Sequence, residues 1–229
     1  MINRAFVHVI AATIVLLPLA ASAATMGELD RQIISCDLVL KNVLQMPDSG
    51  IPRDLLRRCR GLAIFPGVVK LGVVVGVSFG KGVVLRRDEK TGQWSKPVFF
   101  TIRGGSIGLQ VGAQSTDLIL LVMSEQGVQA LLEDKFTLGA DVSVAAGPVG
   151  REASAETSLS FEAGILSYSR TRGLFAGLAV TGAVLEPDGQ ANESYHGKGI
   201  TVQDVFYEGK GSLSDKGRLL VQTLEEATP

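Results

Sequence analysis

The chain has 229 residues, of which 46% are hydrophobic, 20% are charged and only 6% are aromatic. A chain of this length and apolar content can bury a sizeable core as one domain, so general disorder is excluded. The formal net charge is −1, so any attraction to nucleic acid or anionic lipid must come from a local basic patch. The 27 glycines and the few aromatic residues favour tightly packed, turn-rich β structure.

The first 23 residues have the pattern of an export signal. Arg4 precedes an apolar run that ends at Ala21, and the following Ser-Ala completes a small-residue cleavage site. This pattern predicts cleavage after Ala23, which leaves 24–229 as a single domain in the periplasm or on the cell envelope. An uncleaved membrane anchor is the alternative, although the run is short for a membrane span and contains a proline.

An amphipathic helix is predicted from Met26 to Gln45. Apolar residues recur there at helical spacing, at Leu29, Ile33, Cys36, Leu40 and Val43. The other face mixes acidic with basic residues, which favours packing on the domain over a role at a membrane surface. A proline and a glycine break this helix, and a shorter helix is predicted from Arg53 to Arg60, capped by Gly61.

The two cysteines lie on these two predicted helices. Cys36 stands ten residues before Met46, and Cys59 stands nine residues after Gly50. If the helices form an antiparallel hairpin, the two thiols lie about level, and an oxidising compartment would favour a disulfide between them. Two separate buried thiols are the alternative.

Beyond Gly61 the apolar pattern changes to the period of two that is typical of strands. A short strand at 62–65 and a turn at 66–67 precede a strand from Val68 to Phe79. In that strand bulky apolar residues alternate with glycine and serine, so one face is nearly bare and open to close approach by another element. Residues 106–114 repeat the design, and the two strands are therefore expected to share a packing partner.

The remaining elements complete an α+β domain. They are a bend at 80–82, a hairpin loop at 88–92, extended segments at 94–102, 117–123, 135–146, 157–168 and 174–184, turns at 104–105 and 170–173, helices at 124–134, 192–196 and 214–226, and a short element at 201–207. We expect an antiparallel sheet, strongly curved or barrel-like, with the N-terminal helical hairpin and the C-terminal helix packed on it.

Patterns for catalysis and for metal or nucleotide binding are missing from the sequence. His196 is the one histidine after the export signal, no serine has the glycine neighbours of a nucleophile elbow, and the cysteines lack zinc-type spacing. Glycines recur every fourth residue over 72–80, as in a transmembrane glycine zipper, but Lys70 and Lys81 leave too short an apolar run for a span. We therefore expect a binding protein without catalytic activity, cofactor or nucleic-acid partner.

Basic residues are the best candidates for a binding surface. The candidates are Arg57, Arg58, Arg60, Lys70, Lys81, Arg170 and Arg172. Arginine side chains fit phosphate geometry, so this cluster is expected to bind the headgroups of anionic phospholipids. A structural or protein-interaction domain of the envelope is the alternative, because solvation or a surface ion pair explains any one of these charges equally well.

Four stretches of the chain carry a family resemblance. They are LLRRCRGLAIFPGVVKLGVVVGVSFGKGVVL at 55–85, GGSIGLQVGAQSTDLILLV at 104–122, FTLGADVSVAAGPVG at 136–150 and SYSRTRGLFAG at 167–177. In this order they closely resemble the SYLF domain, also called the Ysc84 or DUF500 family, over about residues 28–200. The resemblance implies a lipid-binding module, since eukaryotic members bind phosphoinositide membranes and, in the yeast branch, actin filaments. It also makes Lys70 and the turn from Ser167 to Gly177 candidates for a shared surface.

Overall fold

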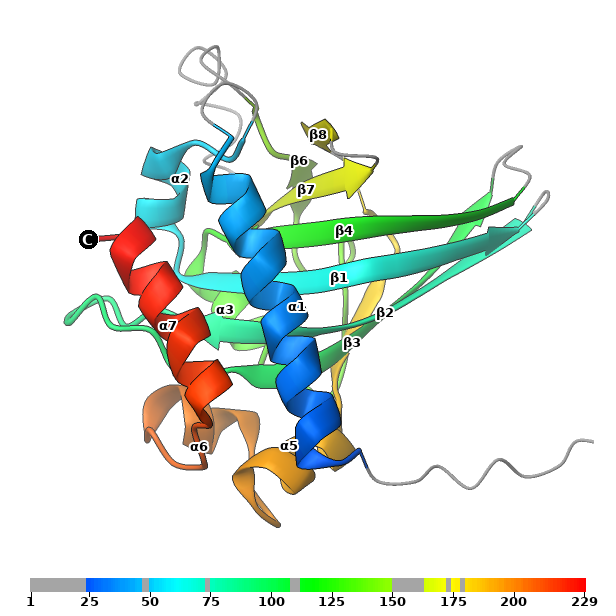
Figure 1. Ribbon diagram of the computed structural model, residues 1–229. Coiled ribbons are helices and arrows are strands. Elements are labelled where there is room, and N and C mark those ends of the chain that lie inside the picture. The colour runs from blue at the N-terminus through cyan, green and yellow to red at the C-terminus, as the bar shows by residue number, and fades with distance from the viewer. Residues whose placement is uncertain are drawn as a thin grey trace, which may run out of the picture.

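The computed structural model describes residues 24–46, 50–72, 75–107, 112–149, 163–171, 174–177 and 180–229 (Figure 1). Its helices are α1 (Met26–Leu44), α2 (Arg53–Arg58), α3 (Glu125–Ala130), α5 (Gly189–His196), α6 (Val202–Tyr207) and α7 (Asp215–Ala227). Its strands are β1 (Gly61–Gly72), β2 (Val75–Arg86), β3 (Val98–Ile107), β4 (Gly112–Val122), β5 (Phe136–Thr137), β6 (Val144–Ala146), β7 (Ile165–Thr171), β8 (Leu174–Gly177) and β9 (Val184–Pro187).

The strands form one curled sheet. Its order is β5-β9-β3-β2-β1-β4-β7-β6, with β8 paired to β7, and the pairs are antiparallel except for β6 with β7. Strands β5 and β6 lie at the two ends of this order, yet Val144 follows Thr137 by only seven positions in the chain. Such a segment spans at most about 25 Å, so the sheet has to curl until its ends approach each other. The predicted α+β fold with a curved sheet is confirmed.

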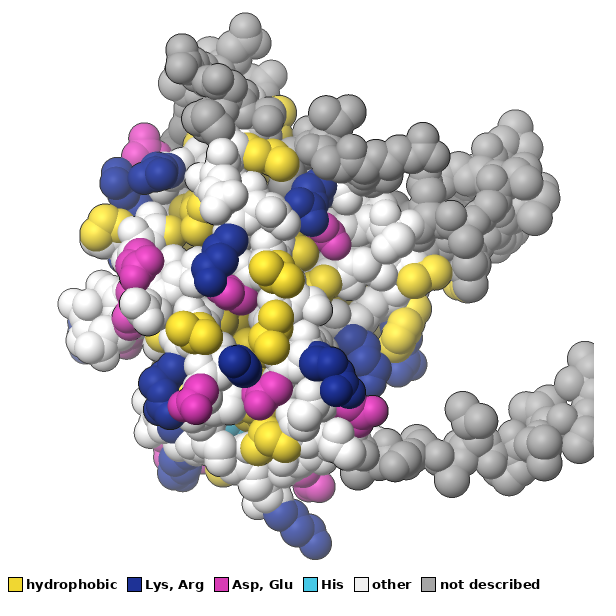
Figure 2. All heavy atoms as spheres, viewed as in Figure 1, with side chains coloured by type: hydrophobic (Ala, Val, Ile, Leu, Met, Phe, Trp, Pro, Cys, Tyr) yellow, Lys and Arg dark blue, Asp and Glu magenta, His cyan; other side chains and the backbone are white. Residues whose placement is uncertain are grey.

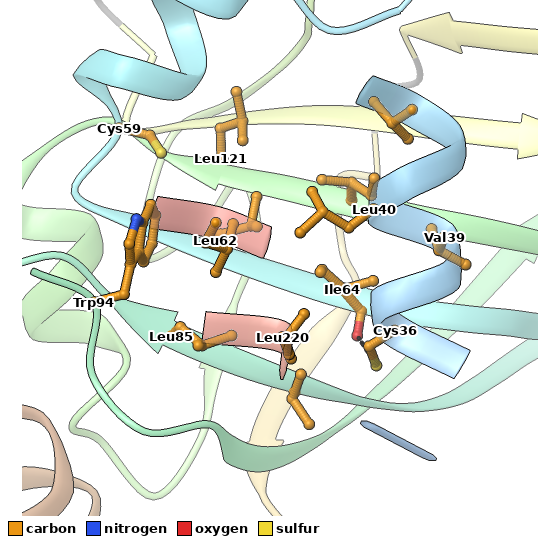
Figure 3. Packing of buried hydrophobic residues seen from close by; sticks show 14 of the residues in the cluster. Cys36, Val39, Leu40, Cys59, Leu62, Ile64, Leu85, Trp94, Leu121 and Leu220 are labelled. Carbon is orange, nitrogen blue, oxygen red and sulfur yellow. Dashed lines mark hydrogen bonds between the residues drawn. The ribbon is translucent and has the colours of Figure 1, made fainter. Parts of the chain in front are cut away.

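Each face of the sheet buries its own hydrophobic cluster. Along β1, Leu62 and Ile64 pack into the cluster beneath α1, α2 and α7, whereas Ala63 and Phe65 pack into the cluster inside the curl. Figure 3 shows Leu62 and Ile64 between the helices and the neighbouring strands. Because a fully buried leucine or phenylalanine contributes roughly 1.5–3 kcal/mol, both clusters hold the fold together.

The two long helices are specified by local signals, and both predictions are confirmed. Helix α1 begins with a capping box between Thr25 and Glu28, and α7 begins after the N-cap Ser214. The helices run side by side, because the Ser214 hydroxyl donates to Asp30 at 2.6 Å and the Thr223 hydroxyl donates to Asp37 at 2.7 Å. They form a layer over the outer face of the sheet (Figure 1).

Two hairpins replace the single strands predicted at 68–79 and 106–114. β1 ends at Gly72 and β2 begins at Val75, with Gly72 opposite Gly76, so the chain reverses in the middle of the predicted strand. In the same way β3 continues through 104–105, where a turn was predicted, and β4 begins at Gly112. Both predictions were wrong, because the same apolar alternation continues on either side of each reversal and periodicity cannot reveal it.

Other helix and strand boundaries also differ from the predicted ones. Gly61 opens β1 instead of capping α2, which ends at Arg58. The turn predicted at 66–67 is a bulge in β1, where Gly67 has a φ of 58°. The extended segment predicted at 174–184 is divided between β8 and β9, and the bend predicted at 80–82 lies within β2. Residues 157–162 of another predicted strand lie outside the described residues.

The predicted disulfide between Cys36 and Cys59 is wrong, since both are free, buried thiols. Cys36 Sγ lies 3.5 Å from the Ile64 carbonyl oxygen, whereas Cys59 precedes β1 in an extended conformation and its thiol donates to Leu56. Five residues of extended chain from 59 to 64 span about 16 Å, far beyond disulfide reach. Figure 3 shows the two sulfurs at different ends of the same cluster.

We expect the folded protein to react slowly with thiol reagents and the denatured, unreduced protein to yield two thiols per chain. Burial raises the pKa of Cys59 to about 12 and that of Cys36 even further, and the thiolate is the reactive form. Thiol counting with a chromogenic reagent, with and without denaturant, measures both values. A denatured Cys59→Ser variant should yield one thiol, and a count of zero in the denatured, unreduced wild type would contradict the expectation.

Candidate binding surfaces

His196 contacts two backbone carbonyls of the fold. Its Nε2 lies 2.9 Å from the Pro97 carbonyl oxygen and its Nδ1 lies 3.1 Å from that of Ser212, so the ring links two loops. Burial lowers its pKa, which favours the neutral ring at neutral pH. Over the part of the chain that the structure describes, no group of His, Cys, Asp and Glu side chains could hold a metal ion.

One polar groove lies where α2 meets the loop between β2 and β3. Arg57, Arg58, Arg60 and Arg87 line it together with Cys59, Asp88, Glu89 and Gly92, and its volume is about 340 Å³. We call it the arginine groove. Two of its arginines end α2, where cations complement the helix dipole. The groove therefore gathers three of the predicted candidates.

Arg87 is the member of the groove that sequence reasoning missed. It lies just after β2, and its guanidinium donates from Nε to the Gly92 carbonyl at 3.0 Å, from Nη2 to that of Thr228 at 2.7 Å, and from Nη1 to that of Arg57. The guanidinium also lies 5.9 Å from the Trp94 ring centroid. Among the residues whose contacts are described, no carboxylate pairs with Arg87. Two of these carbonyls, those of Arg57 and Thr228, come from distant parts of the chain, so only folding identifies Arg87.

The acids around the groove are already engaged. Arg60 pairs with Glu89 and, at 2.9 Å, with Glu125. The Asp88 carboxylate accepts the backbone N–H groups of Lys90 and Thr91, and these hydrogen bonds, that of Thr91 foremost, lower its pKa. Asp88 therefore stabilises its own loop.

A second surface lies at the far end of β1 and β2, beyond the helix layer. α1 crosses these strands at Gly82 and Ile64, whose carbonyls accept hydrogen bonds from Gln32 and Cys36. Past the crossing the outer face continues, and Val69, Val77 and Phe79 expose 40%, 64% and 45% of their surface. Figure 1 shows the strands projecting beyond α1, and Figure 2 shows hydrophobic side chains on this side of the molecule.

Two cations stand beside these apolar side chains. Arg103 lies opposite Phe79 in the sheet register and pairs with Glu186 at 2.6 Å. Lys81 follows on the same face of β2 and pairs with Asp188 at 3.1 Å. The two cationic side chains are 61% and 51% exposed, against 29% and 17% for their acidic partners, so the cations face outwards. The hairpin end denotes Val69, Val77, Phe79, Lys81 and Arg103.

Arg170, a further predicted basic residue, joins neither surface. Arg170 donates from Nε and Nη2 to the Asp117 carboxylate at 2.9 and 2.6 Å, which ties β7 to β4 in a half-buried ion pair. The Lys70 side chain and residue Arg172 lie outside the described part of the structure. The predicted residues that are described are therefore divided among a groove, a sheet end and a structural ion pair, and do not form one cluster.

The fold defines an α+β domain with a curled, mostly antiparallel sheet and a helix layer on its outer face. The chain belongs to the Ysc84 family, which is the SYLF family that its sequence motifs resemble. The model of that family, described as "Las17-binding protein actin regulator", matches residues 103–227. The family resemblance is thus confirmed. Of the helices that the structure describes, none is long and apolar enough to cross a membrane.

Curated relatives match most of this chain. Protein YSC84 of Saccharomyces cerevisiae is 38% identical over 181 residues, which cover 78% of this chain and 38% of the relative. LAS seventeen-binding protein 3 of the same yeast is 35% identical over 176 residues, with 76% and 38% covered. The SH3 domain-containing YSC84-like protein 1 of Homo sapiens is 32% identical over 162 residues, with 70% and 47% covered. The chain therefore spans less than half the length of each of these relatives.

Proposed function

We propose that this protein is a non-catalytic module that attaches to anionic phospholipid membranes through the hairpin end. The observation that supports the proposal is the apolar outer face of β1 and β2, which continues past the helix layer and leaves Val69, Val77 and Phe79 exposed. Exposed apolar groups that adjoin one another on a small soluble domain commonly mark an interaction site. If the predicted export signal operates, the membrane is one of the cell envelope.

The energies involved support reversible attachment. Burying the exposed half of a valine or phenylalanine contributes about 1 kcal/mol. A lysine or arginine near an anionic bilayer contributes about 1 kcal/mol as well. Lys81 and Arg103 lie further out than their acidic partners, so both can face phospholipid headgroups. Three apolar groups and two cations together contribute about 5 kcal/mol, part of it sensitive to salt.

A protein partner is the second candidate. The family description names Las17 binding and actin regulation, and one yeast relative is named for binding Las17. An apolar centre flanked by ion pairs also resembles the composition of a protein interface. On this reading the hairpin end would bind an envelope protein instead of lipid.

Vesicle flotation of residues 24–229 tests the proposal. We expect the protein to float with phosphatidylcholine vesicles that contain phosphatidylglycerol at least about tenfold more than with phosphatidylcholine alone, and less at high salt. Equal, negligible flotation with both vesicles would contradict the proposal. Photo-crosslinking from position 77 in cells then distinguishes the second candidate, because it would recover a protein.

A further inference from the structure

We infer that the arginine groove binds a soluble phosphate group, as a site separate from the hairpin end. Its lining contains four arginines and two acids, so its local charge is positive although the whole chain carries −1. Phosphate is the ligand class that planar guanidinium groups bind best, through paired N–H donors.

Arg87 makes the groove a preorganised site. Three backbone carbonyls from separate segments hold its guanidinium, and each uses one N–H. A guanidinium has five N–H donors, so one remains on each of Nη1 and Nη2. Because the side chain is already ordered, a ligand that binds it meets little further entropy cost. The charge of Arg87 faces neutral carbonyls, which do not cancel it.

The acidic residues of the groove leave the Arg87 guanidinium available to a ligand. Asp88 accepts hydrogen bonds from its own loop, and Glu89 pairs with Arg60 on one side of the groove. Arg57 makes only a 3.6 Å contact with Asp54, whose side chain is 88% exposed, and such exposed pairs contribute little. A phosphate can therefore approach Arg57 and Arg87 without breaking a strong ion pair.

The position of the groove favours a soluble ligand over a lipid headgroup. Arg60 immediately precedes Gly61, the first residue of β1, whereas the hairpin end begins at Val69. Eight residues of strand span about 26 Å. Figure 1 shows α2 and the projecting strand ends on opposite sides of the molecule. A bilayer that holds the hairpin end would leave the groove in water.

Calorimetric titration of residues 24–229 with inorganic phosphate and with glycerol 3-phosphate, at an ionic strength held constant with chloride, tests the inference. We expect saturable binding of both, weakened at least about tenfold by the double change Arg57→Gln and Arg58→Gln, since it removes two charged hydrogen-bond donors from the groove. Arg53→Gln is the matched control, because Arg53 lies on α2 but outside the groove lining. The control should change affinity less than about twofold.

Three results would overturn the inference. The first is binding no stronger than that of chloride, and the second is an unchanged affinity in the double variant. The third is loss of vesicle flotation in the double variant, which would make the groove a headgroup site. If the double variant still floats with vesicles but no longer binds phosphate, the inference is supported. The titration contains no lipid, so it tests phosphate binding by the groove even if the protein does not attach to membranes.

Discussion

Replacing Gly82 with alanine is expected to destabilise the domain by about 3 kcal/mol. A Cβ built at this position in β2 would lie 2.1 Å from the Ile64 carbonyl oxygen and 2.5 Å from Phe65 Cδ1. Ile64 belongs to β1, which is paired to β2 on one side and to β4 on the other. The backbone of β1 therefore cannot move aside without disturbing two ladders, and the strain remains in the folded state.

Urea denaturation followed by circular dichroism measures this loss. Gly189→Ala is the matched control, because Gly189 is the first residue of α5 and a Cβ there would meet no atom within 4 Å. The control is expected to be neutral or to stabilise by less than about 1 kcal/mol. An unchanged midpoint for Gly82→Ala would contradict the close contact between β1 and β2.

Changing Val77 and Phe79 together to serine is expected to lower partition into anionic vesicles by about 30-fold or more. Each change removes roughly 1 kcal/mol of apolar burial at the bilayer, and 1.4 kcal/mol corresponds to a factor of ten. Both side chains are about half exposed or more in the free protein, at 64% and 45%, so the loss of stability should be small. Flotation at a fixed lipid concentration measures the effect.

Leu219→Ser provides the control for this double variant. Leu219 is 48% exposed on α7, which lies outside the hairpin end. Its change removes an exposed apolar side chain from a place that the proposal does not use, so flotation should stay within about twofold of the wild type. Wild-type flotation of the double variant would show that the hairpin end is not the attachment surface.

Helices and the family were predictable because their signals are local in the chain. Thr25 with Glu28, Ser124 and Ser214 are N-caps whose hydrogen bonds reach only three residues along the sequence. The motifs at 55–85 and 104–122 likewise carry the Ysc84 resemblance as continuous stretches. A short-range pattern is visible before the chain folds.

The glycines of 72–80 show what such local patterns cannot predict. The bare face of the predicted strand was expected to be a site of close approach, and this holds at Gly80, where a Cβ would come within 2.8 Å of Val68 Cγ2 across the β1–β2 pair. The partner was wrong, however, since it is the other strand of the same hairpin and not an element shared with a second strand. Alternation records which residues share a face and leaves open where the chain turns back.

Amino-acid order alone therefore specified the starts of α1, α3 and α7, the α+β class, the family and the basic character of α2. Folding decided which basic side chains of the whole chain remain available to bind a ligand. Arg170 became half of an ion pair with Asp117, while Arg87 was brought between Arg57, Gly92 and Thr228. The point at which α1 crosses the sheet likewise decided that Phe79 is exposed while Val83, on the same face of β2, is buried. Pairing and coverage join residues far apart in the chain, and no local pattern encodes the distance between them.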